Sequence, residues 1–415
     1  MTRTQMFNNN NLVPAYANNP LIAACGNIRD TSQIISALTF LPELPGEGAK
    51  LPFYIRKHLV PSIRDLYIPT PVCISLAETI DVMLRQGYSK RRPGTNDFWN
   101  TFYSKNQPPM APSAASVVGI SGMGKTVTIE KILNLYPQTF VHENFPGYKS
   151  RFKQLVWLKV DAPESGKIGD FAYNLMVATN LALESEYFDV SLKKVKRDSG
   201  MFDEWLEVAK KHALGILVID EIQNFFKLAP KKDRLKNKLE EKLELRIVDD
   251  QTLKSVLTLT NSLRMPILAS GTPDGLAIFK TRLSTAERLS TDGHHSMSLP
   301  ISSIDKDFSE TMFPILSQYQ WVKQKMPVSA ELRDHLYELT AAIPRVYKSL
   351  WMAAHKVAFE RGEDKLTIQI FTLAMNTYLK PVIPAIQAIK SNSPHKLKMY
   401  EDILPRDHQV WSISM

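Results

Sequence analysis

The chain has 415 residues, of which 44% are hydrophobic and 22% charged, so it is long enough for two or three folded domains. No apolar run approaches the roughly 20 residues that cross a bilayer, and the opening MTRTQMFNNNN lacks the apolar stretch of a secretory signal, which predicts a cytoplasmic protein. Cys25 and Cys73 are too few for a disulfide framework or a structural zinc site. The net charge of +9 favours nucleic acid as a partner, although many soluble proteins are basic.

Residues 1–110 are rich in Pro and Asn and hold only short apolar clusters. We expect them to form an irregular or small helical appendage. The stretch 108–113, Pro-Pro-Met-Ala-Pro-Ser, is typical of a linker, because proline lacks a backbone donor and biases the residue before it away from helix.

Between residues 111 and 300 short apolar strands alternate with longer helices, which predicts an α/β domain with a mainly parallel sheet. The expected strands are 115–118, 155–160, 216–219, 266–269 and 297–299, and the expected helices include 126–136 and 202–212. The charge-dense segment 227–246 has the leucine spacing of an amphipathic helix, so its charges indicate a solvated face.

After residue 300 the pattern becomes helical. The clearest helices are expected at 330–339, 345–360 and 367–379. We interpret residues 301–380 as a helical lid and 381–415 as a C-terminal tail.

Residues 119–126 read Gly-Ile-Ser-Gly-Met-Gly-Lys-Thr, which satisfies the phosphate-loop pattern between an expected strand and an expected helix. Glycines in this loop let backbone N–H groups point inward and cradle phosphates at the helix N-terminus. Lys125 can reach the β- and γ-phosphates, and the Thr126 hydroxyl can ligate Mg²⁺. The pattern therefore predicts a site for ATP and Mg²⁺ formed by Gly119, Ser121, Gly122, Met123, Gly124, Lys125 and Thr126.

The apolar run 214–219 leads into Asp220 and Glu221, the form of a Walker-B strand. We expect Asp220 to hold Mg²⁺, directly or through water, and Glu221 to orient or deprotonate the attacking water. The alternative is a pair of acids that cap a buried strand. A carboxylate pair at this point predicts hydrolysis of ATP rather than binding alone.

Four further side chains are candidates for the same site. Thr272 lies in the turn after strand 266–269, where its hydroxyl can sense the γ-phosphate, and a plain turn is the alternative. Arg282 and Arg288 follow on a short helix, where oligomeric ATPases often place an arginine that reaches into a neighbour's site. Arg345 starts a lid helix, where it can touch the phosphates of its own chain. For each arginine the alternative is an ordinary exposed side chain.

These elements predict an AAA+ P-loop fold, and over most of its length the chain resembles the TnsC/TniB group of AAA+ transposition regulators. The resemblance rests on 15–22 (Ala-Tyr-Ala-Asn-Asn-Pro-Leu-Ile), 218–223 (Val-Ile-Asp-Glu-Ile-Gln), 271–273 (Gly-Thr-Pro) and the segment 379–389. It implies an ATPase that forms rings or helical filaments on double-stranded target DNA. Such a protein passes a signal from a target selector of the TnsD/TniQ type to the transposase, and hydrolysis resets the assembly. By this analogy 1–110 binds the selector and 381–415 contacts the transposase.

The resemblance also implies DNA contacts in the loops after the second strand and before the Walker-B strand. The basic residues there are Lys167, Lys193, Lys194, Lys196 and Arg197. They would bind phosphates without reading bases, which gives strong salt dependence. A solvated charged surface is the alternative.

Two features depart from this family. The lid position of Arg345 need not be basic in the members most like this chain, and the chain stops soon after the lid, which indicates a short natural form or a shortened chain. Two other classes share the core motifs: an initiator or helicase-loader ATPase, for which we expect a winged-helix module after the lid, and a signalling ATPase that binds only proteins. The leading interpretation places the protein in the bacterial cytoplasm, associated with DNA.

Overall fold

The computed structural model describes residues 8–95, 113–149, 151–194, 199–225, 265–273 and 290–391. A five-stranded parallel sheet forms its centre, with the strand order β4-β5-β6-β1-β7. The strands are β4 (Trp157–Asp161), β5 (Ile216–Asp220), β6 (Ile267–Gly271), β1 (Ala114–Gly119) and β7 (Gly293–Met297). Every residue of β1, β5 and β6 is buried, as parallel strands covered on both faces should be. The predicted α/β fold with a parallel sheet is confirmed.

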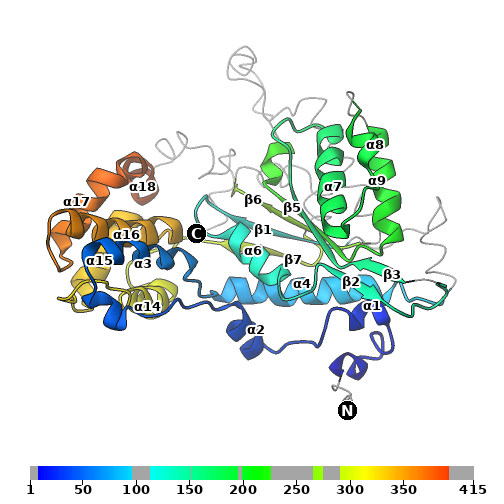
Figure 1. Cartoon of the computed structure of the whole chain (residues 1–415), viewed down its shortest axis with the longest axis horizontal. Helices are drawn as coiled ribbons and strands as arrows, with labels where there is room; N and C mark the ends of the chain where they lie inside the picture. Colours follow the sequence, from blue (N-terminus) through cyan, green and yellow to red (C-terminus); the bar gives the residue numbers. More distant parts are fainter. Residues whose placement is uncertain are drawn as a thin grey trace.

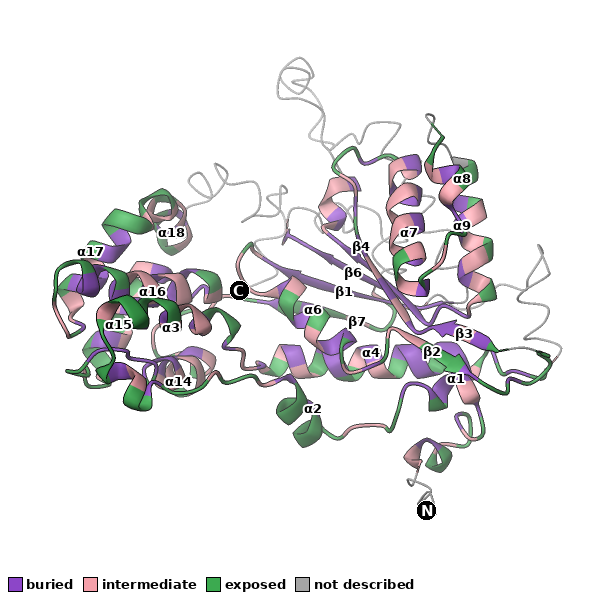
Figure 2. Ribbon diagram, viewed as in Figure 1, coloured by how far each residue is buried: buried purple, intermediate pink, exposed green. Residues whose placement is uncertain are grey.

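Helices cover both faces of this sheet (Figure 1). One face carries α7 (Ile168–Leu183), α8 (Asp189–Leu192) and α9 (Ser199–Lys211), and the other carries α4 (Pro71–Ser89) and α6 (Lys125–Leu133). On the first face the buried Trp205 indole donates a hydrogen bond to the Thr179 hydroxyl at 2.9 Å. Figure 2 shows burial concentrated in the strands and on the sheet-facing sides of these helices, which gives a three-layer α/β/α arrangement.

Residues 8–95 do not form the separate appendage that the sequence suggested. They contain η1 (Asn9–Leu12), α1 (Pro20–Ala23), α2 (Thr31–Leu38), η2 (Gly46–Lys50), α3 (Phe53–Leu59), η3 (Val60–Asp65) and the 19-residue α4. Leu76, Ile80 and Leu84 of α4 recur every fourth residue and share one core with Val117 of β1 and Val218 of β5. α4 is therefore part of the ATPase core, because it is one of the helices that cover the sheet.

The C-terminal region is helical, as predicted. It contains the π-helical η5 (Asp307–Met312), α14 (Phe313–Leu316), α15 (Ala330–Thr340), α16 (Pro344–Glu360), α17 (Ile368–Tyr378), η6 (Lys380–Val382) and α18 (Ile383–Ser391). Ile386 of α18 is buried in the lid core, so the lid runs past its expected end at residue 380. Val60 and Ile63 of η3 lie in the same core, and Phe53 of α3 packs against Phe359 of α16 with the ring centroids 5.3 Å apart, at the left of Figure 1.

Two strand predictions need correction. The expected strand 155–160 is divided at Val156 into β3 (Phe152–Leu155) and β4, and β3 pairs antiparallel with β2 (Thr139–His142) in a separate two-stranded sheet. The N–H of Val156 donates to the carbonyl of Gln138 at 2.8 Å, at the point where the chain passes from one sheet to the other. β7 spans 293–297 rather than 297–299, and its polar sequence Gly-His-His-Ser-Met lies on an edge of the sheet.

No helix in the described part of the chain is long and apolar enough to span a membrane.

Candidate nucleotide site

The phosphate loop connects the end of β1 to the start of α6. Gly122 and Gly124 have φ angles of 91° and 89°, in the left-handed region that glycine enters without a steric penalty. A Cβ atom on Gly122 would lie 3.0 Å from Cγ2 of Ile343, so the lid packs closely on this loop. The N-cap of α6 is Gly124, which has no side chain, and the N–H groups in the first turn of a helix point out of its N-terminal end, here toward the loop. This geometry suits a phosphate group.

Lys125 is fixed over the loop by the loop's own backbone. Its Nζ donates to the carbonyl of Gly119 at 2.6 Å and to that of Ile120 at 3.3 Å. Only 7% of the residue is exposed. The ammonium group is therefore held by the backbone of the loop that would surround a phosphate.

The side chains of Thr126, on α6, and Asp220, at the end of β5, contact each other. The Thr126 hydroxyl donates to Oδ2 of Asp220 at 2.8 Å, and Oδ1 of Asp220 accepts from the N–H of Glu221 at 3.0 Å. Asp220 is 1% exposed. A hydroxyl and a carboxylate are the oxygen ligands that Mg²⁺ prefers, so these two residues fit a magnesium ion that also binds nucleotide phosphates.

Glu221 has a φ angle of 53°, which is unusual for a residue other than glycine. Gln223 lies in η4 (Ile222–Phe225). Its side-chain NH₂ group donates to Oε2 of Glu221, and the Oε1 atom of Gln223 accepts from the N–H of Thr272 at 3.3 Å. The backbone at Glu221 is constrained, as residues at functional sites often are. Gln223 thus joins Glu221 to the turn after β6, which lies between β5 and β1 in the sheet.

From the sequence, Gln223 stands out only as the last residue of the motif 218–223 that resembles the TnsC/TniB group. The signal that could have found it is its position two residues after Glu221, within reach of the neighbouring strand end. Thr272 is 5% exposed and lies at this same edge, and its role in sensing the γ-phosphate stays a prediction.

Lys159 is not among the site residues predicted from the sequence. It lies on β4, on the same face as Asp220, and its Nζ is 3.0 Å from Oε1 of Glu130 and 3.7 Å from Oδ2 of Asp220. Burial by itself would lower the pKa of Lys159, but the hydrogen bond to Glu130 and the nearby carboxylates outweigh it and raise that pKa. Lys159 therefore remains a cation beside the candidate metal ligand.

The lid reaches the phosphate loop through Arg345. Its backbone N–H donates to the carbonyl of Gly122 at 3.2 Å, and its Cβ lies 3.4 Å from the position of a Cβ on Gly122. Its side chain is exposed at the start of α16. The structure thus brings Arg345 to the loop, while Arg282 and Arg288 lie outside the described residues.

Three of the basic DNA-contact candidates, Lys167, Lys193 and Lys194, are described and exposed, and Lys196 and Arg197 lie outside the described residues. Lys167 directly precedes α7, and the other two precede α9. Both helices end against β3: Lys153 donates to the carbonyl of Leu183, and the carbonyl of His212 accepts from Leu155. The helices are therefore parallel, and both start at the carboxyl edge of the sheet.

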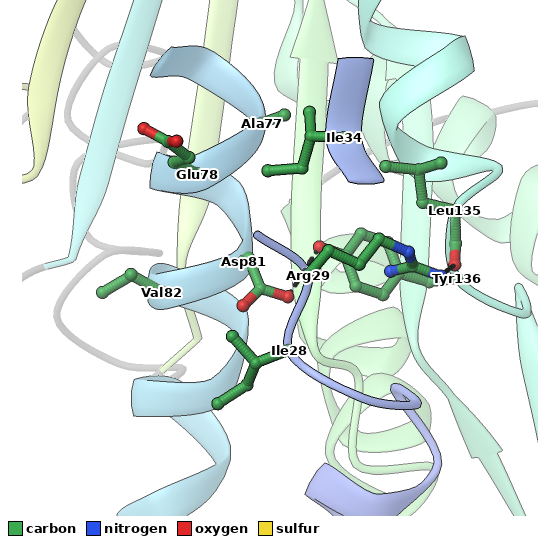
Figure 3. A pocket seen from close by; sticks show the side chains of 9 residues that line it. All are labelled: Ile28, Arg29, Ile34, Ala77, Glu78, Asp81, Val82, Leu135 and Tyr136. Carbon is green, nitrogen blue, oxygen red and sulfur yellow. Dashed lines mark hydrogen bonds between the residues drawn. The ribbon is translucent and has the colours of Figure 1, made fainter. Parts of the chain in front are cut away.

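A cavity of about 150 Å³ lies apart from the phosphate loop, between Ile28 and Arg29, α2, α4 and the segment after α6 (Figure 3). The Tyr136 hydroxyl donates to Oδ1 of Asp81 at 2.8 Å, and Nη2 of Arg29 donates to the carbonyl of Leu135 at 2.7 Å. Burial raises the pKa of Tyr136 well above its ordinary value, so the phenol stays protonated. These contacts join α4 and the segment before α2 to the segment after α6, and they involve none of the predicted nucleotide ligands.

The fold and the site together define a P-loop ATPase of the AAA+ class. Residues 110–273 match the protein family described as AAA domain. This range includes the phosphate loop, the Asp220–Glu221 pair and Thr272. A comparison with curated proteins gave no match. The chain therefore contains an AAA+ ATPase domain, a domain that binds ATP, usually with Mg²⁺.

Proposed function

We propose that this protein is an ATP-dependent DNA-binding regulator of transposition, which oligomerises on target DNA and links a target selector to the transposase. In this proposal ATP hydrolysis is the switch that resets the assembly. The nucleotide chemistry is assigned to the phosphate loop, Asp220 and Glu221. The transposition role is supported by the sequence motifs that resemble the TnsC/TniB group.

One structural observation supports a coupling between the nucleotide site and DNA binding. The loop before Lys167 is hydrogen-bonded to the residues on either side of Glu221. The Asn224 side-chain amide donates to the carbonyl of Ala162 at 2.9 Å, and the N–H of Ala162 donates to the carbonyl of Asp220 at 2.9 Å. A Cβ on Gly166 would lie 2.9 Å from the carbonyl oxygen of Asn224. A shift of Glu221 would therefore move the Lys167 loop.

The second basic segment, with Lys193 and Lys194, follows α8 and precedes α9. Phe171 in the first turns of α7 stacks with Phe202 of α9 at a ring distance of 6.4 Å, so the two helix starts are neighbours. Lys193 and Lys194 precede α9 and are exposed, as Lys167 is. Exposed cations on these two segments suit a phosphate backbone, and they carry no means of reading base sequence.

The partners remain part of the proposal. Family resemblance supports a ring or filament of identical chains, with Arg282 or Arg288 reaching the neighbour's nucleotide. It also supports a selector of the TnsD/TniQ type at the N-terminal segment and transposase subunits at the tail 381–415.

The direct test is binding of the full chain to random-sequence duplex DNA with ATP, a slowly hydrolysed analogue, ADP or no nucleotide. We expect binding with ATP or the analogue, and a loss of affinity as salt rises. Charge reversal of Lys167, Lys193 and Lys194 to Glu should abolish binding, whereas Lys325→Glu, at an exposed position of the lid, should not.

Three outcomes separate the candidate functions. DNA binding with stimulation of a transposase supports the proposal. DNA binding without that stimulation favours an initiator or helicase-loader ATPase. Failure to bind DNA with any nucleotide overturns the proposal and favours an ATPase that acts only on proteins.

A further inference from the structure

Lys159 lies among three carboxylates that come from three different parts of the ATPase core. Its Nζ is 3.0 Å from Glu130 of α6, 3.7 Å from Asp220 of β5 and 3.9 Å from Asp161 at the end of its own strand. The Lys159 side chain is 16% exposed and that of Asp220 is 2% exposed. Water therefore screens the interaction between these two charges only weakly.

Glu130 holds the ammonium group in place. The Lys159–Glu130 contact is the shortest of the three and is a hydrogen bond as well as an ion pair. Glu130 is on α6, one turn after Thr126, so the contact sets Lys159 next to the helix that begins the phosphate loop.

Asp220 does not depend on Lys159 for its orientation. Its Oδ2 already accepts from the Thr126 hydroxyl at 2.8 Å, and its Oδ1 accepts from the N–H of Glu221 at 3.0 Å. These two hydrogen bonds fix the carboxylate. Lys159 thus adds a positive charge beside Asp220 and contributes little to its geometry.

We propose that Lys159 is an internal counter-ion of Asp220 that opposes the binding of a divalent cation at Thr126 and Asp220. This inference rests on the proposed ATP and Mg²⁺ site. The ammonium neutralises Asp220, and its charge repels a second cation at the same carboxylate. The triphosphate supplies the compensating negative charge, so Mg²⁺ binds the protein as its nucleotide complex rather than beforehand.

The test is a titration of Mn²⁺, a paramagnetic substitute for Mg²⁺, into the full chain holding a slowly hydrolysed ATP analogue. Electron paramagnetic resonance reports the free ion, so the affinity is measured without turnover. Lys159→Met removes the charge and keeps the chain length, and it should tighten Mn²⁺ binding about tenfold. Lys159→Arg keeps the charge and should stay within about twofold of the parent chain.

Lys153→Met is the matched control, because Lys153 contacts Leu183 and Glu184 and none of the residues proposed to bind nucleotide or metal. Its Mn²⁺ affinity should equal that of the parent chain. Thermal unfolding identifies a variant that fails to fold, and Lys159→Gln, which can still donate to Glu130, then replaces Lys159→Met with the same expectation.

Equal or weaker Mn²⁺ binding by Lys159→Met and Lys159→Gln overturns this inference and leaves the nucleotide site intact. If the parent chain binds no Mn²⁺ with the analogue, or if Lys125→Ala binds it equally well, the proposed site fails and the inference fails with it.

Discussion

The guanidinium group of Arg56 and the carboxylate of Asp364 form a two-pronged ion pair, with Nη1 and Nη2 at 2.6 and 2.9 Å from the two carboxylate oxygens. The two residues are 308 positions apart in the sequence. Arg56 is in α3 and is 1% exposed, and its guanidinium also faces the rings of Phe53 and Phe359. This pair fastens the N-terminal segment to the lid that touches the phosphate loop.

Replacing Asp364 with Asn should destabilise the lid, because it leaves the buried Arg56 cation without its carboxylate. Breaking a fully buried pair in this way costs about 3–5 kcal/mol, and the 21% exposure of Asp364 lowers our expectation to about 2 kcal/mol. Urea unfolding followed by tryptophan fluorescence measures the loss. Glu47→Gln, in an ion pair whose side chains are 70% and 85% exposed, is the control and should leave the midpoint unchanged. Equal midpoints for the two variants would contradict the structural role of the pair.

The lid should lose stability in mild acid because of His355. Its Nε2 accepts from the N–H of Trp321 at 3.1 Å and its Nδ1 donates to the carbonyl of Trp351 at 2.8 Å. Burial lowers the pKa of His355 from 6.5 to about 4. Since the folded state resists protonation, stability is complete above pH 6.5 and falls by about 3 kcal/mol as the pH drops to 4.

The free energy of unfolding measured between pH 4.5 and 7.5 tests this prediction. His355→Gln can keep one acceptor and one donor, and it should flatten the pH dependence. The pKa of Asp364 is held below its ordinary 3.8 by the hydrogen bond from Arg56, so its own contribution is lost only below this window. The same pH slope in the variant and the parent chain would rule His355 out.

The phosphate loop was predictable because its chemistry requires fixed residue types at fixed spacing. Only glycine suits the left-handed positions 122 and 124, and the lysine and threonine must follow at once. The strand, the loop and the helix start were therefore located from local sequence alone.

The role of α4 was hidden by its polar residues. Arg85 is 1% exposed, yet it pairs with Asp81 and donates to Asn10, so a charged side chain lies inside the fold. Local sequence does not show that such a charge has partners 75 residues away. Proline at the first position of α4 also gave the segment a loop-like appearance.

The contacts of Asp220 could not be predicted from the sequence, because they depend on which residues of neighbouring strands lie opposite each other. Trp157 to Asp161 of β4 pair with Ile216 to Asp220 of β5, so Lys159 lies opposite Val218, on the same face of the sheet as Asp220. From there its Nζ reaches to 3.7 Å from Oδ2 of Asp220. In the sequence Lys159 is an isolated cation in a strand, a pattern that usually indicates a solvated face. Gln223 was obscured for the same reason, since its partner Thr272 is on another strand end.

Lys125→Ala should remove nucleotide binding and, with it, nucleotide-dependent assembly on DNA. A charge-assisted hydrogen bond contributes about 1.5–3 kcal/mol, and loss of a lysine that is predicted to reach the β- and γ-phosphates should weaken binding about 100-fold. Equilibrium titration with a fluorescent ATP analogue measures this. Lys131→Ala, on the same helix, faces the rings of Phe40 and Tyr67 and should retain binding. Assembly that still depends on nucleotide in Lys125→Ala would refute the phosphate-loop assignment.

Glu221→Gln should bind ATP as tightly as the parent chain and hydrolyse it at least about 100-fold more slowly, because an amide cannot accept the proton of the attacking water. The substitution should preserve the local geometry, since the amide oxygen can still accept the hydrogen bond from Gln223. Single-turnover hydrolysis gives the rate, and electron microscopy should show that its DNA-bound assemblies persist with ATP. Glu184→Gln, whose side chain is 86% exposed, is the matched control. Unchanged turnover in Glu221→Gln would mean that another group activates the water, and Gln223 and Thr272 would then be the next residues to replace.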